Sequence, residues 1–314
     1  MVALVQHRSP PSAAANALVG NAANSTDSGR RRRFRRPLNR IDAFDSAAAD
    51  LYIGEPAAQV SAVHALADVA DGSPFTRRQQ CVDVLCGYLR EPWATGREVG
   101  DERTVRDTIV AVLADRMRRR RIRGNWSGVA IDLRNAYLEN ADFTEAVFRG
   151  PALFESATLA GVTRFDGATF LGQTHFQSAV FDTAWFRESV FTESARFFGT
   201  RFGSGRFDET TFRDCAQFPL AVFTREARFY RTAFQRGAYF DSAQFRGDAD
   251  FGAAAFTGPA RFDGSTFTTG SSFDHARFDS PVAAAQRNSV ENHRMARGLI
   301  GDPTPRVNFS GAPV

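Results

Sequence analysis

The hydrophobic pattern of the chain changes near residue 130. Before that point apolar residues recur three and four positions apart, and beyond it a large apolar residue recurs every five or six positions. The first spacing is that of an amphipathic helix, whereas the second matches neither the helical period of about 3.6 nor the strand period of about 2. The two parts of the chain therefore predict two different architectures.

The first pattern predicts four helices that form either a small bundle or a cap like those of helical repeats. Gly54, Gly72 and Pro92 interrupt the pattern at the points where helices would end. Arg118 to Arg121 follow the last stripe, where cations suit the negative end of a helix. The apolar stripes run over residues 38–51, 56–70, 75–89 and 101–117.

The second pattern is a repeat of 28 large apolar centres from Leu133 to Phe278. Leu occupies three centres and Phe the other 25, and the residue two positions earlier is small in every case except Ile131. A small and a large residue two positions apart point to the same side of an extended chain. We therefore predict a β-solenoid in which each short strand turns a corner and the rings stack inside.

The steps of six residues follow a rule. Ten of the steps are six residues long, and all ten end on odd-numbered centres when Leu133 is counted as the first. This parity predicts a four-sided coil in which two opposite corners accept an extra residue. Inserting a residue into a five-residue step, such as 202–207, is accordingly expected to be costly. The predicted structural core contains Phe143, Phe148, Phe165, Phe186, Phe207, Phe229, Phe251 and Phe273.

The repeat resembles the motif Ala-(Asp/Asn)-(Leu/Phe)-x-x of the pentapeptide-repeat family, most clearly in NAYLENADFTEAVF at 135–148. The resemblance implies a right-handed quadrilateral β-helix, here of about seven coils. The helical block is also similar to segments that precede such repeats in actinobacterial proteins. We expect a disordered basic tail at 1–37, a helical domain at 38–123, the β-helix at 124–281 and a C-terminal helix or tail at 282–314.

Charge is distributed unevenly along the chain. Residues 1–123 carry 20 Arg and 14 acidic residues, while residues 124–281 carry 15 and 19, and the whole chain has net charge +4. The N-terminal tail ends in RRRFRR, which is either a solvated segment or a contact for nucleic acid or another anionic surface. The cations concerned are Arg31, Arg32, Arg33, Arg35 and Arg36.

Cysteine usage and hydropathy favour a cytoplasmic protein. Cys81, Cys86 and Cys215 have no metal-ligand spacing, which suits buried thiols in a reducing compartment. No run of about 18 apolar residues predicts a membrane span, and the first residues lack the pattern of a secretory signal.

One face of the predicted coil carries a candidate binding surface. The residue just before each centre points outward, and on this face these residues are Arg164, Trp185, Arg206 and Arg228. They form either a planar cationic patch for a carboxylate or phosphate, or an ordinary exposed strand surface. Another face predicts a flat, uncharged wall at residues 147, 169, 190, 211, 233 and 255.

No arrangement of residues indicates catalysis or a cofactor. The five His are dispersed, and no phosphate loop, nucleophile elbow or metal spacing occurs. A filled solenoid also has no cavity for a substrate. We therefore expect a non-catalytic protein without a cofactor.

Three functions remain open. The first is a structural or protein-interaction module, which the family resemblance favours because most members have no known activity. The second is a DNA-mimicking regulator of a type II topoisomerase such as gyrase, as the resemblance implies for some members, although 15 Arg interrupt the acids of this repeat. The third is binding of an anionic surface through residues 31–36 and 116–123.

Trp126, just before the repeat, has two interpretations: it is either a plug for the first coil or an exposed linker residue.

Overall fold

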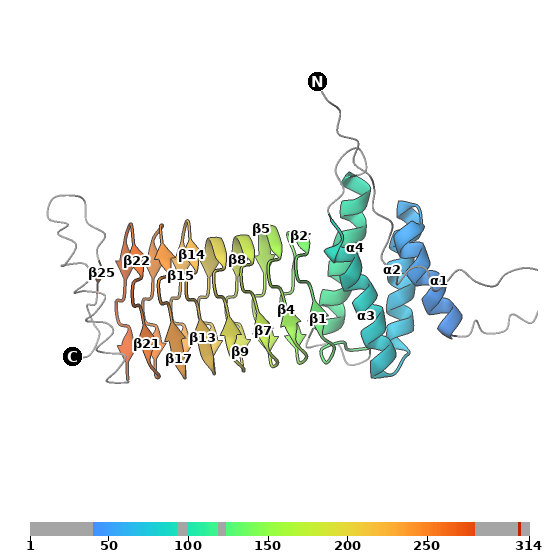
Figure 1. The fold of residues 1–314 in the computed structure, drawn as a ribbon. Helices are drawn as coiled ribbons and strands as arrows, with labels where there is room; N and C mark the ends of the chain where they lie inside the picture. The colour runs from blue at the N-terminus through green and yellow to red at the C-terminus, as the bar shows by residue number, and fades with distance from the viewer. Residues whose placement is uncertain (1–39, 93–98, 119–123, 280–306, 309–314) are drawn as a thin grey trace, which may run out of the picture. The chain divides into compact units, whose positions relative to one another are not determined.

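The computed structural model describes residues 40–92, 99–118, 124–279 and 307–308. Within these ranges four helices precede a stack of short parallel strands, as Figure 1 shows. All of these elements belong to one compact unit that begins at residue 39. The predicted disordered tail with its Arg run, and the predicted C-terminal helix, lie outside the described residues.

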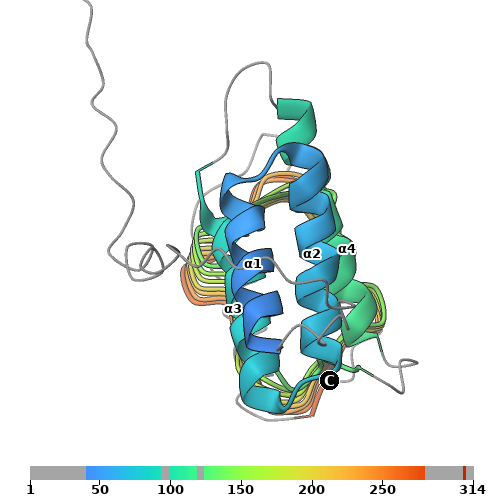
Figure 2. The ribbon, with the colours of Figure 1, turned by 90° about the vertical axis from the view of Figure 1, so that its right-hand side faces the viewer.

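The four predicted helices are present. Pro56 starts the second helix in its first turn, where a missing N–H costs nothing, and Gly72 ends it. Leu51, Leu66 and Leu85 are fully buried in the bundle. Figure 2, which looks along the stack of coils, shows the helices from the side in front of the coils. No described helix is long and apolar enough to cross a membrane. The helices are α1 (Arg40–Ile53), α2 (Pro56–Asp71), α3 (Phe75–Arg90) and α4 (Val99–Met117).

The strands form four faces, which confirms a β-solenoid preceded by helices. The first face holds β1 (Ile131–Asp132), β4 (Ala152–Leu153), β7 (Thr174–His175), β10 (Ala195–Arg196), β13 (Cys215–Gln217), β17 (Gly237–Tyr239) and β21 (Ala260–Arg261). The fourth face holds β3 (Val147–Phe148), β6 (Thr169–Phe170), β9 (Val190–Phe191), β12 (Thr211–Phe212), β16 (Ala233–Phe234), β20 (Ala255–Phe256) and β24 (Arg277–Phe278).

The second and third faces share one sheet, because three long strands pass from one face to the next. These are β5 (Thr158–Arg164), β8 (Val180–Trp185) and β11 (Arg201–Arg206). The second face also holds β2 (Tyr137–Glu139), β14 (Val222–Phe223), β18 (Gln244–Phe245) and β22 (Thr266–Phe267). The third face also holds β15 (Ala227–Arg228), β19 (Ala249–Asp250), β23 (Ser271–Ser272) and β25 (Val307–Asn308).

Stacked Phe rings fill the interior of the coils. On the third face Phe186, Phe207 and Phe229 follow one another with ring centroids 4.9 Å apart. This distance matches the strand separation of about 4.8 Å, so the side-chain stack and the backbone ladder share one spacing. All eight Phe residues of the predicted core are at most 1% exposed. Gly205 replaces the usual small residue because a Cβ there would lie 2.9 Å from the ring of Phe223.

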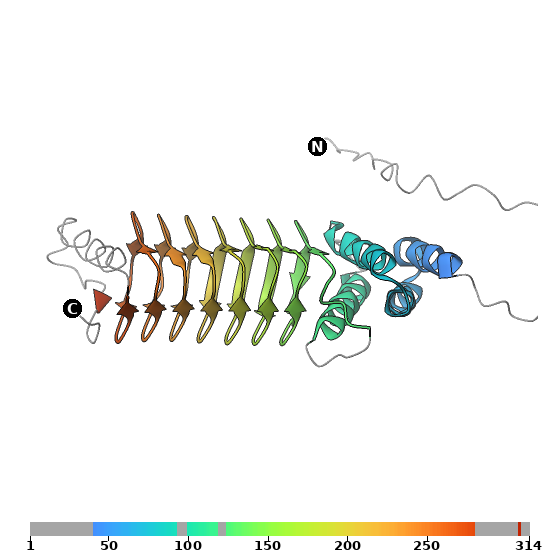
Figure 3. The ribbon, with the colours of Figure 1, turned by 90° about the horizontal axis from the view of Figure 1, so that it is seen from below.

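The corners are of two kinds. After each centre of the first and third faces, the second residue has a positive φ, as at Glu209 (56°) and Leu220 (57°). These corners are tight, and each is part of a five-residue step. The ten six-residue steps all lie at the other two corners, which we call loose. At one of them β5 takes up its extra residue as a bulge between Leu159 and Val162. Figure 3 shows the stacked coils from below, next to the helices.

This geometry corrects the expectation for residues 202–207. That step lies at a loose corner, where β11 runs straight through from the second face to the third. Other coils hold six residues at the same corner, as in the step from Phe223 to Phe229. The costly position for an insertion is therefore the tight step that follows, residues 207–212.

Trp126 lies between the helices and the first coil and is fully buried. Its indole Nε1–H donates to Oδ1 of Asp71 at 2.8 Å, and the guanidinium of Arg116 lies 5.4 Å from the centre of its ring. Arg90 of α3 also pairs with Asp132 of β1. The helices therefore pack directly on the first coil, and of the two interpretations of Trp126 the exposed linker residue is wrong.

Candidate functional site

The four residues of the predicted candidate surface form one row on the third face. Arg164 of β5 pairs in register with Trp185 of β8, Trp185 with Arg206 of β11, and Arg206 with Arg228 of β15. Each side chain points outward because the next residue is a buried Phe and successive strand residues alternate sides. We call these four residues the third-face row.

Trp185 is the centre of the third-face row. The guanidinium carbons of Arg164 and Arg206 lie 4.8 Å and 5.9 Å from its ring centre, close enough for cation–π attraction. Arg187, which the repeat pattern did not indicate, lies closer still at 4.5 Å. Its position two residues beyond Trp185 is the only sequence signal for this contact. The buried Nε1 of Trp185 has no hydrogen-bond partner within the described residues.

Acidic neighbours neutralise much of the third-face row. Arg206 pairs with Glu226 at 3.0 Å, and Arg228 pairs with Asp208 at 3.0 Å. Burial raises the pKa of the Asp208 carboxyl, and Arg228 opposes that rise. Arg164 differs, because within the described ranges its guanidinium has no ion pair; it lies over the face of Trp185, and Asp142 is its neighbour in the first coil. The row is thus a mixed-charge surface with unused donors at one end, not a uniformly cationic patch.

The predicted flat wall lies on the fourth face. Val147, Thr169 and Val190 are paired in register there, and the row continues through Thr211, Ala233 and Ala255. Arg277 follows next, so the uncharged row ends at the last coil. The side chains in this wall are short and partly buried, and none provides a hydrogen-bonding arrangement comparable to the third-face row.

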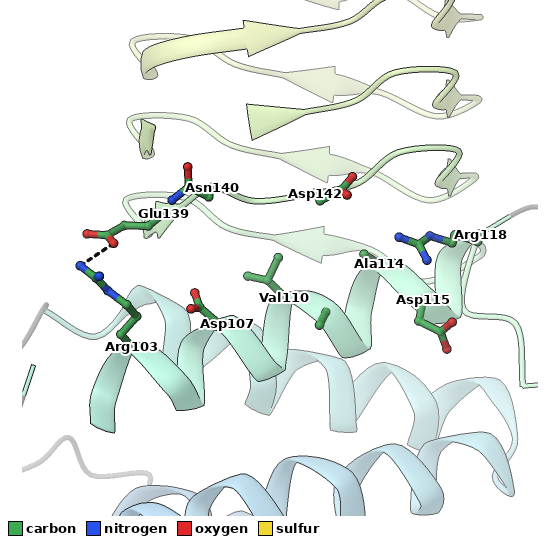
Figure 4. Close-up of a pocket in the computed structure, with 10 residues that line it drawn as sticks. Arg103, Asp107, Val110, Ala114, Asp115, Arg118, Glu139, Asn140 and Asp142 are labelled. Atoms are coloured by element: carbon green, nitrogen blue, oxygen red, sulfur yellow. Dashed lines mark ion pairs between the residues drawn. The ribbon is translucent and has the colours of Figure 1, made fainter. Parts of the chain in front are cut away.

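A groove with a volume of about 630 Å³ opens between α4 and the first coil, as Figure 4 shows. Arg103 and Glu139 form an ion pair of 2.7 Å across it. Burial raises the pKa of the Asp107 carboxyl, and nearby Glu139 adds to the rise while Arg103 opposes it. No pattern in the sequence indicates this groove, because it exists only when α4 packs on the coil. It is lined by Arg103, Asp107, Val110, Ala111, Ala114, Asp115, Arg118, Glu139, Asn140 and Asp142.

The other candidates for chemistry are dispersed. Among the described residues, no three His, Cys, Asp or Glu side chains gather in a metal-binding arrangement. Burial raises the pKa of Cys81 to about 11 and of Cys86 to about 12, so both thiols are weak nucleophiles. His64 is exposed, and Nδ1 of His175 lies 2.9 Å from Oε1 of Glu155.

Comparison with known families identifies the repeat. A family model described as "Pentapeptide repeats (9 copies)" matches residues 133–180, 154–201, 207–255 and 240–282. The chain belongs to the pentapeptide-repeat family. Comparisons with curated proteins and with solved structures find no match. The matched segments of this pentapeptide-repeat protein coincide with the stacked coils, whereas α1 to α4 precede them.

Proposed function

We propose that this protein is a non-catalytic interaction module that holds a protein partner on the third face of its rod. The observation that carries the proposal is the register of Arg164, Trp185 and Arg206, which presents one indole between two guanidinium groups. Trp and Arg are the residues that most often dominate the energy of protein interfaces. The ring stacks below them hold the row rigid, which lowers the entropy lost on binding.

The partner surface that fits this row contains carboxylates. Arg164 has a guanidinium without an ion pair in the described part of the chain, and it lies over the face of Trp185. A guanidinium donates hydrogen bonds, and a carboxylate accepts them in the planar geometry that guanidinium favours. The interior filled with rings favours recognition on the outer surface over chemistry in an enclosed pocket.

We also propose a cytoplasmic location, which the free thiols of Cys81, Cys86 and Cys215 support. A DNA-mimicking role toward a topoisomerase has less support. Such a role needs a row of unpaired acids, whereas Glu226 and Asp208 on the third face are paired with Arg. The Arg run at 31–36 lies outside the described residues, so contact with nucleic acid or an anionic surface through it stays a prediction.

The test compares capture of a partner by matched variants of the full chain. Arg164→Glu and Trp185→Ala change the third-face row, while Arg201→Glu changes an exposed Arg on the second face of a neighbouring coil. We expect the wild type and Arg201→Glu to retain the same partner from native lysate, and both row variants to lose it. All four proteins should have similar melting temperatures, because the changed side chains point away from the core.

Two outcomes would contradict the proposal. One is a partner retained equally by all four proteins, which would place the contact elsewhere. The other is a topoisomerase whose capture depends on the acids beside the row, such as Asp208 and Glu226, and not on Trp185. That second result would favour the DNA-mimicking role.

A further inference from the structure

At the edge of the first coil that faces the helices, some backbone N–H and C=O groups have no partner strand in the described part of the chain. The edge is covered at two places, one before and one after this unpaired part. The side-chain amide of Gln79 donates to the carbonyl of Ala130 at 3.0 Å and accepts from its N–H at 2.8 Å, as a neighbouring strand would. Ala146 is covered by an antiparallel bridge with Arg118. Proteins usually protect exposed sheet edges in such ways because an open edge attracts other chains.

The unpaired part contains the backbone of Asp142. The backbone N–H of Arg164 donates to the carbonyl of Ala141 at 2.8 Å, and the backbone N–H of Phe143 donates to the carbonyl of Arg164 at 2.8 Å. Residues 141 and 143 therefore face the second coil, and Asp142 between them directs its N–H and C=O the other way, toward α4. No hydrogen bond within the described ranges involves the backbone N–H or C=O of Asp142. The backbone N–H and C=O of Glu139 point the same way as those of Asp142, because the backbone N–H of the next residue, Asn140, donates to the carbonyl of Ala160 in the second coil.

This edge borders the groove beside α4, whose lining is acidic. Four carboxylates and two guanidinium groups line the groove, and one of the guanidinium groups, that of Arg103, is paired with Glu139. The whole chain has net charge +4, so the groove is a local reversal of charge. Burial raises the pKa of Asp107, and an incoming cation would stabilise the charged form of this carboxyl. Val110, Ala111 and Ala114 form an apolar strip on the helix side, of which Ala111 is exposed.

We propose that the groove binds an extended basic peptide segment of a partner protein, which joins the first coil as an added strand. The backbone of the peptide pairs with the N–H and C=O of Asp142, about 4.8 Å away. Its Arg or Lys side chains lie against Asp107 and Asp142, and the alternate side chains pack on the strip of α4. The groove thus selects cations, whereas the third-face row offers donors to carboxylates, so the two surfaces bind different chemistry.

The test measures binding of a fluorescent eight-residue peptide of alternating Arg and Val to the full chain at physiological salt. Asp142→Asn and Asp107→Asn should each weaken binding about five- to tenfold, as expected for a partly buried charge pair. Ala111→Trp, at an exposed position of the lining, should abolish binding by filling the groove. Asp68→Asn is the matched control, because it removes an exposed acid from α2, outside the groove, and should leave binding unchanged.

A second probe tests the added strand itself. The same peptide with its alternate backbone nitrogens methylated keeps its charge but cannot pair with a sheet edge. It should bind at least about tenfold more weakly than the unmodified peptide. Equal affinity of the two peptides, or equal weakening by Asp68→Asn and Asp142→Asn, would overturn the proposal.

Failure of the unmodified peptide to bind the wild type would also overturn it. If binding then appeared once residues 119–123, RRRIR, were replaced by Gly and Ser, the occupant would be that basic linker of the chain itself. Trp185→Ala should have no effect on peptide binding, so this proposal can be tested independently of the one for the third-face row.

Discussion

The indole Nε1–H of Trp126 donates a hydrogen bond of 2.8 Å to Oδ1 of Asp71, the last residue of α2. The other oxygen of Asp71 lies 3.4 Å from the guanidinium of Arg116, near the end of α4. One carboxylate therefore joins two helices to the segment that leads into the first coil. The helices and the coils should consequently unfold together.

Replacing Trp126 tests this coupling. Trp126→Phe keeps most of the packing and removes the hydrogen bond, so we expect it to lower the free energy of unfolding by about 1–2 kcal/mol. Trp126→Ala should cost about 3–5 kcal/mol because it also leaves a cavity. Urea unfolding followed by circular dichroism measures both values. Trp185→Phe, at a partly exposed site, is the control and should cost less than about 0.5 kcal/mol.

The two kinds of corner predict opposite responses to an inserted residue. One Gly inserted between Phe202 and Phe207 should cost less than about 1.5 kcal/mol, because other coils accept a sixth residue at that corner. One Gly inserted between Phe207 and Phe212 should cost more than about 3 kcal/mol. It would displace Thr210, whose hydroxyl donates to the carbonyl of Phe186 at 2.6 Å. Equal melting temperatures of the two insertion variants would contradict the division of the corners.

A tight corner holds Ala253 in a conformation that glycine adopts more easily. Its φ is 53°, which costs an L-residue about 1–2 kcal/mol, while glycine loses about 0.5–1 kcal/mol more conformational entropy on folding. Ala253→Gly should therefore raise the free energy of unfolding by about 0.5 kcal/mol. Ala255→Gly, two residues later in β20, should lower it by about 0.5–1 kcal/mol. Thermal unfolding of the two variants measures both changes. If both variants changed the free energy of unfolding in the same direction, the expectation would be contradicted.

The joint between α3 and the first coil should weaken in acid. Hydrogen bonds from Arg134, with the nearby charge of Arg90, lower the pKa of Asp132 to about 2. Because this pKa is below that of the unfolded chain, about 3.9, the stabilisation is present above pH 4 and is lost as the pH falls toward 2. Asp132→Asn should be less stable than the wild type at pH 6, and the difference should shrink by pH 2.5. Melting temperatures across this range would show a constant difference if Asp132 contributed nothing.

The coils could be predicted from the sequence because each of their contacts repeats. Every Phe at a centre of the repeat meets an equivalent Phe one coil away, so the spacing of Phe165, Phe186 and Phe207 determines the stack and the outward row of Arg164, Trp185 and Arg206. The groove could not be predicted in this way. It depends on contacts that occur once, such as that of Gln79 with Ala130, which are 51 residues apart and follow no period.

The parity of the six-residue steps already assigns each five-residue step to a corner. The step 202–207 ends on the fifteenth centre, an odd number, so it lies at a loose corner; it was misjudged because only its length of five residues was considered. Arg187 was overlooked for a different reason. Corner residues have no fixed outward direction in the repeat, so its contact with Trp185 depends on the local turn.

Because the loose corners take up extra residues, the number of residues in a coil can change without changing the alignment of its outward rows. Paired residues are 22 positions apart between Ala152 and Thr174 but 21 apart between Ala195 and Ala216, and both pairs remain in register. A coil can thus gain or lose a residue during evolution without rotating the outward rows above it. The residues of each outward row can therefore be substituted independently of the interior. Such substitutions change what the rod recognises, while the stacked Phe rings stay the same.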